Sequence, residues 1–579
     1  MPNHFPIILP VLMPVLMIAS GMCSAQSVLR VDDDALSGGD GQAWASAYDN
    51  LQSALGAATS GDEIWIAQGL YMPSDGDATM SFVMLDGVSI YGGFMGNETA
   101  RDQRDPATNI TRLSGDVGRD DTFDPYMLNT ANAGHVVVAS GVGSGTVIDG
   151  VTIEYGAYGP SGTGAGNPLM FGSGIYCISG SPTINNCVIQ FNYTAFAAGG
   201  GMYFLNAHPA ITNTTVQYNS GHLSNGAGIF LGGSSGAVIE DCAIRYNTVV
   251  FSSPDGYGGG ISHDSDGELI VRRSIFEGNL VRPFFSLGDN VGYGGGIFSF
   301  RSPLTVEDSV FKNNTASIGG GIIAWNEALI VNTIFENNTA QAREGTIQEL
   351  GGFGGGFCSY SFQQRDMYLE NCTFVNNDGK EHGGASGGWN SNLIVNNCIF
   401  FGNTGWNPEF QGYYREHIGG SFDLRYSLIP GIFGPPAEGE DPIDAENLPG
   451  CIEANPMFVS TTDFRLSANS PAIDAGENAG WTSILMTDFD GNPRFVDDPN
   501  TPDTGAGPSP VIDMGAYEFQ VTASCPADIT GDGQLNFFDV SAFLSAFAAN
   551  DLIADFTGDG QFNFFDVSAF LSAFAAGCP

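Results

Sequence analysis

A repeat in the middle of the chain constrains the fold more than any other feature of the sequence. Within it, a hydrophobic residue is followed three positions later by asparagine, and this pattern occurs eight times. The eight pairs are Ile189/Asn192, Val216/Asn219, Ile244/Asn247, Phe276/Asn279, Phe311/Asn314, Phe335/Asn338, Phe374/Asn377 and Phe400/Asn403. Successive copies are 24 to 39 residues apart, so their spacing varies while the pattern is kept. Such a chain buries the apolar face of each copy against its neighbours, as solenoid proteins do.

Two further columns become visible when the copies are aligned on the asparagine. Eight positions before it, every residue is branched and apolar: Ile184, Ile211, Ile239, Val271, Val306, Ile330, Leu369 and Val395. Five positions before it, every residue is small: Cys187, Thr214, Cys242, Ser274, Ser309, Thr333, Cys372 and Cys398. The first column predicts a buried ladder, and the second predicts a position where only small side chains are accepted.

Each copy contains short β-branched runs at strand spacing, broken by Gly, Asn and Asp. Coils stacked about 4.8 Å apart align like residues into ladders. We therefore predict a mainly β fold, a right-handed parallel β-helix solenoid. The asparagine is expected at a bend, where its amide bonds the backbone or the asparagine of the next coil. Propeller blades and helical repeats fit the period and the strand spacing poorly.

Glycine clusters follow the asparagines after loops of varying length. Three of them read Gly-Gly-Gly-Ile, at Gly258–Ile261, Gly294–Ile297 and Gly319–Ile322. Together with the Phe-x-x-Asn motif, they resemble the pectate-lyase-like parallel β-helix superfamily and the repeats of polymorphic outer-membrane proteins. The resemblance covers roughly residues 26–430 and implies a fold without implying an activity.

Both ends of a solenoid need a cover. At the N-terminal end of the region 26–430, Trp44, Tyr48, Leu51 and Leu55 have helical spacing. This spacing predicts a short amphipathic helix that caps the first coil. The apolar run at residues 63–67 predicts a strand directly after it.

Residues 431–520 resemble the C-terminal cap of many secreted bacterial β-helix proteins, through the sequences SANSPAIDAG and DMGAYE. Asp474, Asp490, Arg494 and Asp513 have the composition of an active site. We interpret them instead as parts of a hydrogen-bonded cap that holds irregular loops together.

Residues 1–25 are predicted to be a secretory signal, because the charge-free apolar run 5–22 is followed by small residues. A membrane anchor is the alternative, and Pro6, Pro10 and Pro14 argue against it. No later stretch has 18 uninterrupted apolar residues, so no transmembrane segment is expected in the mature chain. We expect a bacterial protein that is secreted or displayed on the cell surface. Its net charge of −45, from 18 Lys+Arg and 63 Asp+Glu, argues against nucleic acid as a partner.

The C-terminal region 521–579 contains a tandem duplication whose two 23-residue copies differ at two positions. Each copy has oxygen-bearing residues and a glycine at the spacing of an EF-hand-type calcium loop. The predicted ligands are Asp528, Thr530, Asp532, Gln534, Asn536 and Asp539 in the first copy, and Asp555, Thr557, Asp559, Gln561, Asn563 and Asp566 in the second. The glutamines contribute backbone carbonyls, and the asparagines bind through water. We expect the tail to bind two Ca²⁺ ions.

One apolar helical stripe follows each loop, and a loop plus one helix, twice, resembles the dockerin domain. The closing Gly577-Cys578 resembles bacterial dockerin-like anchoring tails that end in Gly-Cys. The resemblance implies a small all-α domain and an anchoring protein as partner. Phe-Phe pairs at residues 537–538 and 564–565 stand where cellulosomal dockerins carry recognition residues, which argues against the usual cohesin partner.

Cysteines fall into three groups. Cys525 and Cys578 bracket the duplication, and we predict a disulfide between them. The four cysteines of the small-residue column are expected to be buried thiols. Cys177, Cys358 and Cys451 are left unassigned.

Catalytic residues are not evident. Lyases of this fold combine calcium-binding carboxylates with an Arg or Lys base, and its hydrolases use clustered aspartates. The best candidate cluster is Lys380, Glu381 and His382, near Asp366 or Glu416 if the coils stack as predicted. We interpret this segment as a solvated loop.

Two functions are kept open. Aromatic residues of the long loops are candidates for a sugar-stacking platform: Phe284, Phe285, Trp389, Trp406, Tyr413 and Tyr414. The favoured interpretation is a β-helix for adhesion or carbohydrate contact, whose partner is an extracellular polysaccharide or surface component. The alternative is a polysaccharide lyase or glycoside hydrolase.

Overall fold

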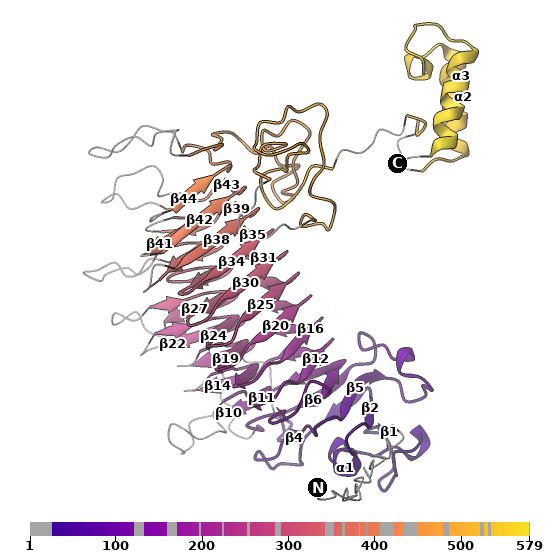
Figure 1. Ribbon diagram of the computed structural model, residues 1–579. Helices are drawn as coiled ribbons and strands as arrows, with labels where there is room; N and C mark the ends of the chain where they lie inside the picture. Colours follow the sequence, from indigo (N-terminus) through magenta and orange to yellow (C-terminus); the bar gives the residue numbers. More distant parts are fainter. Residues whose placement is uncertain are drawn as a thin grey trace, which may run out of the picture.

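The computed structural model describes residues 26–120, 132–158, 171–195, 198–222, 225–251, 255–283, 291–341, 352–361, 365–380, 383–389, 391–405, 422–432, 448–478, 486–520, 526–530 and 534–577. Over these residues the chain winds through four long sheets, which we name A to D (Figure 1). In the central coils the chain passes through sheets A, B, D and C in that order and then returns to sheet A. All ladder pairs between the named strands are parallel, for example Ile211 with Ile239 in sheet A. The predicted parallel β-helix is confirmed.

The strands of sheet A are β1 (Val28–Val31), β2 (Glu63–Ala67), β5 (Ser89–Phe94), β8 (Val147–Asp149), β12 (Thr183–Asn185), β16 (Ala210–Thr212), β20 (Ala237–Glu240), β25 (Leu269–Arg272), β30 (Leu304–Glu307), β34 (Ala328–Val331), β38 (Asp366–Glu370), β42 (Asn392–Asn396) and β44 (Phe422–Arg425). Those of sheet B are β3 (Gly69–Tyr71), β6 (Thr111–Ser114), β9 (Val151–Glu154), β13 (Val188–Gln190), β17 (Thr215–Gln217), β21 (Ala243–Arg245), β26 (Ile275–Glu277), β31 (Val310–Lys312), β35 (Ile334–Glu336), β39 (Thr373–Val375) and β43 (Ile399–Phe401).

The strands of sheet C are β4 (Phe82–Val83), β7 (Val137–Val138), β11 (Ile175–Ile178), β15 (Met202–Leu205), β19 (Ile229–Gly233), β24 (Ile261–Ser265), β29 (Ile297–Ser299), β33 (Ile322–Ala324), β37 (Phe357–Tyr360) and β41 (Ser386–Trp389). Those of sheet D are β10 (Ala157–Tyr158), β14 (Tyr193–Ala195), β18 (Ser220–His222), β22 (Thr248–Phe251), β27 (Leu280–Pro283), β32 (Thr315–Ala316), β36 (Thr339–Ala340) and β40 (Asp378–Gly379). A separate pair is formed by β23 (Gly256–Tyr257) and β28 (Gly292–Tyr293). The helices are α1 (Leu51–Ala57), α2 (Phe537–Ala549) and α3 (Phe564–Ala576), with short 3-10 turns at Trp44–Ser46, Arg101–Gln103 and Leu552–Ala554.

The repeated asparagines form a buried ladder at the bend between sheets B and D. The side-chain amide of Asn247 donates to Oδ1 of Asn279 in the next coil at 3.0 Å and to the carbonyl oxygen of Val216 at 2.9 Å. Its backbone N–H also donates to Oδ1 of Asn279, at 3.1 Å. Asn279 bonds Asn314 and Ile244 in the same way. The prediction that the asparagine amide bonds the backbone and the next asparagine is therefore confirmed.

The small-residue column lies at the bend between sheets A and B. Ser274 is buried, and its Oγ accepts the backbone N–H of Cys242 at 3.1 Å while it donates to the carbonyl oxygen of Arg272 at 2.7 Å. Asp241 and Arg273 form two of these bends, and they have positive φ angles of 54° and 43°, respectively. A larger side chain has no room at such a turn, because the next coil stacks directly against it. The cysteines of this column are buried and free, as predicted: Cys187, Cys242, Cys372 and Cys398.

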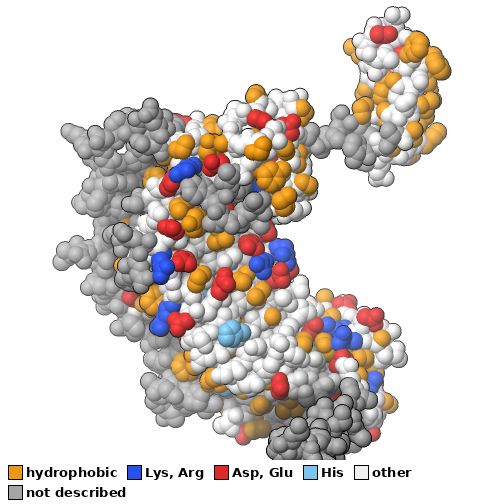
Figure 2. Space-filling model, in the orientation of Figure 1, with side chains coloured by type: hydrophobic (Ala, Val, Ile, Leu, Met, Phe, Trp, Pro, Cys, Tyr) orange, Lys and Arg blue, Asp and Glu red, His pale blue; other side chains and the backbone are white. Residues whose placement is uncertain are grey.

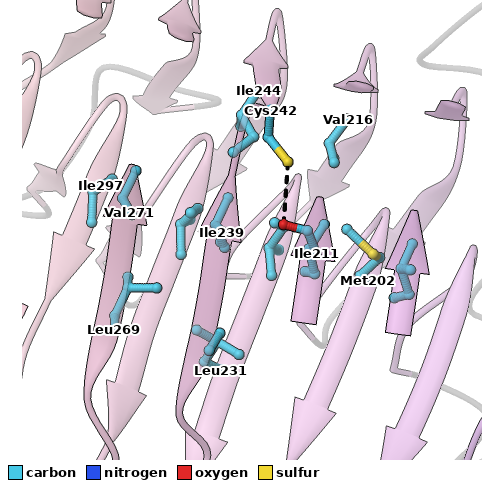
Figure 3. Close-up of a cluster of buried hydrophobic side chains, with 14 of the residues drawn as sticks. Met202, Ile211, Val216, Leu231, Ile239, Cys242, Ile244, Leu269, Val271 and Ile297 are labelled. Carbon is cyan, nitrogen blue, oxygen red and sulfur yellow. Dashed lines mark hydrogen bonds between the residues drawn. The ribbon is translucent and has the colours of Figure 1, made fainter. Parts of the chain in front are cut away.

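The interior of the solenoid is apolar, and every member of the predicted branched column is at most 1% exposed. Figure 3 shows Ile211, Ile239 and Val271 side by side in this column, with Cys242 Sγ directed at the carbonyl oxygen of Ile211, 3.5 Å away. In sheet B the inward position changes from aliphatic to phenylalanine after Ile244. The inward rings then stack from coil to coil: Phe276, Phe311, Phe335, Phe374 and Phe400.

The N-terminal cap is a shorter helix than the spacing predicts. Helix α1 begins after Asn50, whose side chain accepts the backbone N–H of Ser53, and it buries Leu51 and Leu55 against the solenoid core. Tyr48 is not helical, because its backbone N–H donates to the carbonyl oxygen of Arg30 in β1. The strand predicted at residues 63–67 is β2.

The C-terminal cap lies along the side of the solenoid. Phe464, Ala516 and Tyr517 pack with Ile334 and Val375 on the outer face of sheet B. Figure 1 places this region, drawn in orange, beside β35, β39 and β43. The predicted cap thus covers a wall of the last coils.

The buried Arg494 connects the cap to the solenoid. Its Nη2 donates to Oδ1 of Asn332 at 2.7 Å, and it also donates to the carbonyl oxygens of Gly515 and Ala516. Asp513 accepts the backbone N–H groups of Asp474 and Phe519. These contacts are those of a hydrogen-bonded cap, as predicted for Asp474, Arg494 and Asp513. Asp490 is exposed and binds Arg465 instead.

In the C-terminal tail, the two helices α2 and α3 pack through Phe543 and Phe570, whose rings stack with centroids 4.0 Å apart and planes 2° apart. The predicted signal 1–25 and the predicted pair Cys525 and Cys578 lie outside the described residues. Within the described ranges, no helix has the length and apolar character required to cross a membrane.

Candidate functional site

The residues that the sequence singles out for catalysis or sugar stacking do not form a described site. Lys380 is exposed and forms an ion pair with Asp378. Asp366 is exposed in β38 and accepts a hydrogen bond from Asn392. The remaining members fall outside the described residues or have no described side chain: Phe284, Phe285, Glu381, His382, Trp389, Trp406, Tyr413, Tyr414 and Glu416.

A gap interrupts the outer face of sheet C. Tyr176, Tyr203 and Phe230 occupy equivalent outward positions in successive coils, and their rings stack with centroids 5.7 and 5.2 Å apart. In the next coil the equivalent position is Ser262, and in the coil after it is Phe298. One small residue in a column of large ones leaves space between Phe230 and Phe298.

A pocket of about 150 Å³ lies beside Ser262 and Phe298. It is lined by Asn225, Tyr257, Ser262, Asp264, Phe298, Phe300 and Trp325. Ser262 is 1% exposed, and its Oγ has no hydrogen-bond partner among the described residues. Asp264 follows Ser262 by two positions in β24, so both side chains point outward. The pocket therefore combines aromatic walls with a hydroxyl and a carboxylate.

The aromatic wall is held in place by mutual packing. Trp325 meets Phe300 edge to face at 5.0 Å and Phe298 at 5.5 Å. Tyr257 is tilted against Phe298 at 4.6 Å and stacks on Tyr293 at 5.3 Å. Rings in such edge-to-face and offset arrangements support one another. The wall is thus preorganised by neighbouring coils.

The carboxylate of the pocket is balanced by one arginine. Arg301 Nε donates to Asp264 Oδ1 at 2.7 Å, and its guanidinium lies 5.5 Å from the ring centre of Phe300. Burial raises the pKa of Tyr257 to about 12, and the carboxylates of Asp255 and Asp264 add to the shift. The Tyr257 hydroxyl is therefore neutral, and the pocket carries little net charge.

A buried histidine lies behind the floor of the pocket. His263 points inward between Ser262 and Asp264, with Nδ1 2.9 Å from Ser299 Oγ and Nε2 2.7 Å from the carbonyl oxygen of Gly267. Burial lowers the pKa of His263 to about 4, although the Gly267 carbonyl and Asp264 act in the opposite direction. The imidazole is therefore neutral at pH 7.

We expect acid to destabilise the β-helix through His263. Its pKa is about 6.5 when unfolded and about 4 when folded, so the unfolded state binds the proton more tightly. The free energy of unfolding should fall by about 2–3 kcal/mol between pH 7.5 and 4.5 for this group alone. Urea unfolding of the parent and of His263→Gln at both pH values measures this difference.

The exposed His208 provides the matched control for this measurement. His208→Gln replaces an imidazole at an exposed position, so the loss of stability in acid that His263 causes should persist in this variant. Equal pH dependence of the parent and His263→Gln would contradict the buried neutral state of His263.

The first predicted calcium loop is described in part. In the first loop, Asp539 is buried, and it accepts hydrogen bonds from Thr530 and from the backbone N–H of Asn536. These donors, the Asn536 N–H first, lower the pKa of Asp539 to about 2. Asp532 lies outside the described residues, and so do its two neighbouring glycines.

The second loop is described completely. Asp566 accepts from Thr557 and Asn563, and Asp555 accepts the backbone N–H groups of Asp559 and Gly560. Gly560 has the positive φ, 72°, that position 6 of such a loop requires. The donor set consists of oxygens, which fits a hard cation such as Ca²⁺. On binding, the ion would replace some of the N–H groups that now donate to the Asp555 and Asp566 carboxylates.

The tail exposes an unusual amount of apolar surface. Figure 2 shows hydrophobic side chains along its visible face. Phe537 and Phe564 are 76% and 75% exposed, and each is followed by a second exposed phenylalanine, Phe538 or Phe565. Because the duplication repeats the pair, the tail presents two equivalent apolar sites.

The pocket of sheet C was missed by the sequence analysis, although the glycine clusters contain its signal. The residue two places after each cluster is outward in sheet C: Tyr203, Phe230, Ser262, Phe298, Ile323 and Cys358. A Cβ at Gly295 would collide with the carbonyl oxygen of Gly320 in the next coil. Glycine at this close approach therefore fixes the register. When the chain is aligned on the glycines, as it was on the asparagines, Ser262 stands out as a small polar residue in this outward column.

Comparison with known proteins agrees with the fold. Residues 130–340 match the family model described as "Right handed beta helix region". Together with the parallel sheets, this match supports a right-handed parallel β-helix fold. A comparison with curated proteins finds no match.

Several solved structures are similar to the chain. Pectate lyase Pel9A is 14% identical, with a TM-score of 0.40, and the alignment covers 86% of this chain and 98% of that one. A pectin methylesterase from Aspergillus niger is 14% identical, with a TM-score of 0.23 and coverage of 58% and 86%. Pectin methylesterase from carrot is 13% identical, with a TM-score of 0.23 and coverage of 58% and 89%. These TM-scores carry no argument about activity.

Proposed function

We propose that this protein is a secreted or surface-displayed bacterial β-helix that binds extracellular polysaccharide through the pocket of sheet C. The observation that supports this proposal is the gap at Ser262, where a buried hydroxyl without a described partner lies beneath aromatic walls. Sugar rings combine apolar C–H faces with hydroxyl edges, so they need aromatic surface and hydrogen-bonding groups together. A volume of about 150 Å³ suits a single sugar unit of a chain.

The charge of the protein favours a neutral polysaccharide. The formal net charge is −45, which repels polyanions over the range of a Debye length. Within the pocket, Asp264 is already paired with Arg301. A uronic-acid chain would therefore meet an unfavourable field without gaining a free cation in the pocket.

The runner-up function, a polysaccharide lyase or glycoside hydrolase, has less support at this pocket. Hydrolysis at a glycosidic bond uses two carboxyl groups on opposite sides of the bond. The pocket lining contributes one, Asp264, and a salt bridge occupies it. Binding without turnover therefore fits the lining better than catalysis does.

Ser262→Phe is the sharpest test of the binding proposal. A phenylalanine at this position joins the ring column between Phe230 and Phe298 and fills the pocket. We expect thermal stability to be equal or higher and affinity for neutral β-glucans or galactans to fall at least about tenfold, since the stacking space is lost. Affinity electrophoresis in gels with and without each polysaccharide measures the effect.

Trp325→Ala should weaken the same binding by removing an aromatic wall, and Tyr246→Ala is its matched control. Tyr246 is an exposed ring outside the pocket, stacked on Tyr218. Unchanged retardation of Ser262→Phe and Trp325→Ala would contradict the pocket. A reducing-sugar and unsaturated-product screen of the parent, with and without calcium, tests the enzyme alternative.

We further propose that the dockerin-like tail binds two Ca²⁺ ions and attaches the protein to an anchoring partner. The duplicated oxygen-rich loops support the first part, and the exposed phenylalanine pairs support the second. The anchoring partner is expected to be a protein that covers apolar surface, because two equivalent Phe-Phe sites need burial more than charge pairing.

Asp559→Ala should remove one Ca²⁺ from the full mature chain. Asp559 is at position 5 of the second loop, a direct ligand position, and its loss leaves too few oxygens for the ion. Calorimetric titration of the chelator-treated protein counts the ions. Asp551→Ala, at an exposed position between the loops, is the control and should keep the count. An Asp559→Ala protein with the parent's count would contradict the loop assignment.

A further inference from the structure

Three carboxylates from different parts of the C-terminal cap converge at its surface. One carboxylate oxygen each from Asp474, Asp497 and Asp503 lies within 4.8 Å of the others. Asp474 is completely buried, whereas Asp497 and Asp503 are exposed. The cluster thus has a buried floor and an open, solvent-facing side.

One carboxylate oxygen in the floor of this cluster has no hydrogen-bond donor among the described residues. Oδ1 of Asp474 is buried and has no partner among the described residues. Oδ2 accepts only a long bond, 3.3 Å, from the backbone N–H of Asp498. A buried carboxylate oxygen without a donor is costly unless a cation or proton compensates it. The cap arginines are engaged elsewhere, Arg465 with Asp490 and Arg494 with Glu518.

We propose that Asp474, Asp497 and Asp503 bind a calcium ion in the C-terminal cap. The ligand set is all oxygen, which suits Ca²⁺ and not Zn²⁺, which favours nitrogen and sulfur. Oxygens on opposite sides of a Ca²⁺ are about 4.6–5.2 Å apart, so oxygens within 4.8 Å can share one ion. Opposite ligands of Mg²⁺ are about 4.0–4.2 Å apart in a stricter geometry. Water on the open side completes the shell.

The position of the ion couples the cap to the solenoid. Three residues after Asp474, Glu477 exchanges two hydrogen bonds with Asn397, at the bend between sheets A and B. The carbonyl oxygen of Asp474 accepts the backbone N–H groups of Thr504 and Gly505. An ion at the cluster would therefore hold together three cap segments next to their attachment point. Calcium should raise the melting temperature of the cap and the last coils together.

Calorimetric titration of the full mature chain with CaCl₂ tests the site. Asp497→Asn and Asp503→Asn remove exposed ligands, so both proteins should fold, and each should bind one ion fewer than the parent. Asp490→Asn is the matched control, because it breaks an exposed cap ion pair outside the cluster and should keep the count. The tail variant Asp559→Ala should lower the number of bound ions through the tail loop alone. The cap and tail variants therefore test the cap site and the tail site separately.

A second measurement separates cation binding from a shared proton. In the parent, calcium should raise the melting temperature of the β-helix transition, and Asp503→Asn should lose this increase. Unchanged ion counts in both cluster variants would overturn the proposal. A second outcome would also overturn it: Asp503→Asn binds as many ions as the parent and melts at a higher temperature than the parent in chelator. The cluster would then hold a shared proton.

Discussion

Asn279→Ala is expected to destabilise the solenoid by about 3–6 kcal/mol, the largest effect of any single substitution considered for this fold. Removing the side chain leaves the backbone N–H and the amide of Asn247 without their acceptor, and it takes the Asn279 amide donor away from the carbonyl oxygen of Ile244. All these groups are buried, and each unsatisfied group costs about 1–3 kcal/mol. Guanidinium unfolding followed by circular dichroism of the β-helix transition measures the loss.

Two variants make the interpretation specific. Asn392→Ala removes the same atoms from an exposed strand position that makes one hydrogen bond to Asp366, and it should cost under about 1 kcal/mol. Asn279→Asp keeps an acceptor for Asn247 but loses the donor, and it buries a carboxylate. The free energy of unfolding of this variant should rise again as the pH falls, because the protonated carboxyl regains a donor. A loss below about 1 kcal/mol for Asn279→Ala would contradict a cooperative ladder.

Phe335→Ala is expected to cost about 3–5 kcal/mol. The ring of Phe335 is fully buried in sheet B and stacks on Phe311 at 5.2 Å and on Phe374 at 4.5 Å. The substitution opens a cavity inside a close-packed column and removes two ring contacts, and the parallel coils above and below cannot collapse into the space. The same guanidinium unfolding experiment measures the change.

Phe335→Leu is the conservative partner of this variant and should cost about 1–2 kcal/mol, because most of the apolar volume is retained. Phe538→Ala, at an exposed ring of the tail, should leave the β-helix transition within about 0.5 kcal/mol of the parent. Equal guanidinium unfolding midpoints for Phe335→Ala and the parent would show that the stacked rings of sheet B do not stabilise the solenoid.

The N-terminal cap shows where a local pattern is not enough. Trp44 and Tyr48 share helical spacing with Leu51 and Leu55, yet only the last two are in α1. The backbone of Tyr48 pairs with Arg30 in β1, a bond between residues 18 apart in sequence. Such a tertiary contact overrides a weak helical preference, and it cannot be inferred from the spacing of apolar residues.

The repeat by itself determined the parallel β-helix, the branched column, the small-residue column and the asparagine ladder. These features repeat with every coil, so each copy of the motif is independent evidence for the same position in the coil. The calcium-loop pattern of the tail is likewise local, because all its residues lie within one turn and one helix start, such as Asn563 to Asp566.

Only the tertiary structure decided which irregular positions meet. Ser262 lies between Phe230 and Phe298 because loops of different length bring these strands into register. Asp474, with residues 497 and 503, converges on one point only after the cap has folded. Sequence periods report contacts that repeat from coil to coil. The pocket arises where one residue departs from the repeat, and the carboxylate cluster is assembled from loops that do not repeat. Both depend on long-range packing that no single segment encodes.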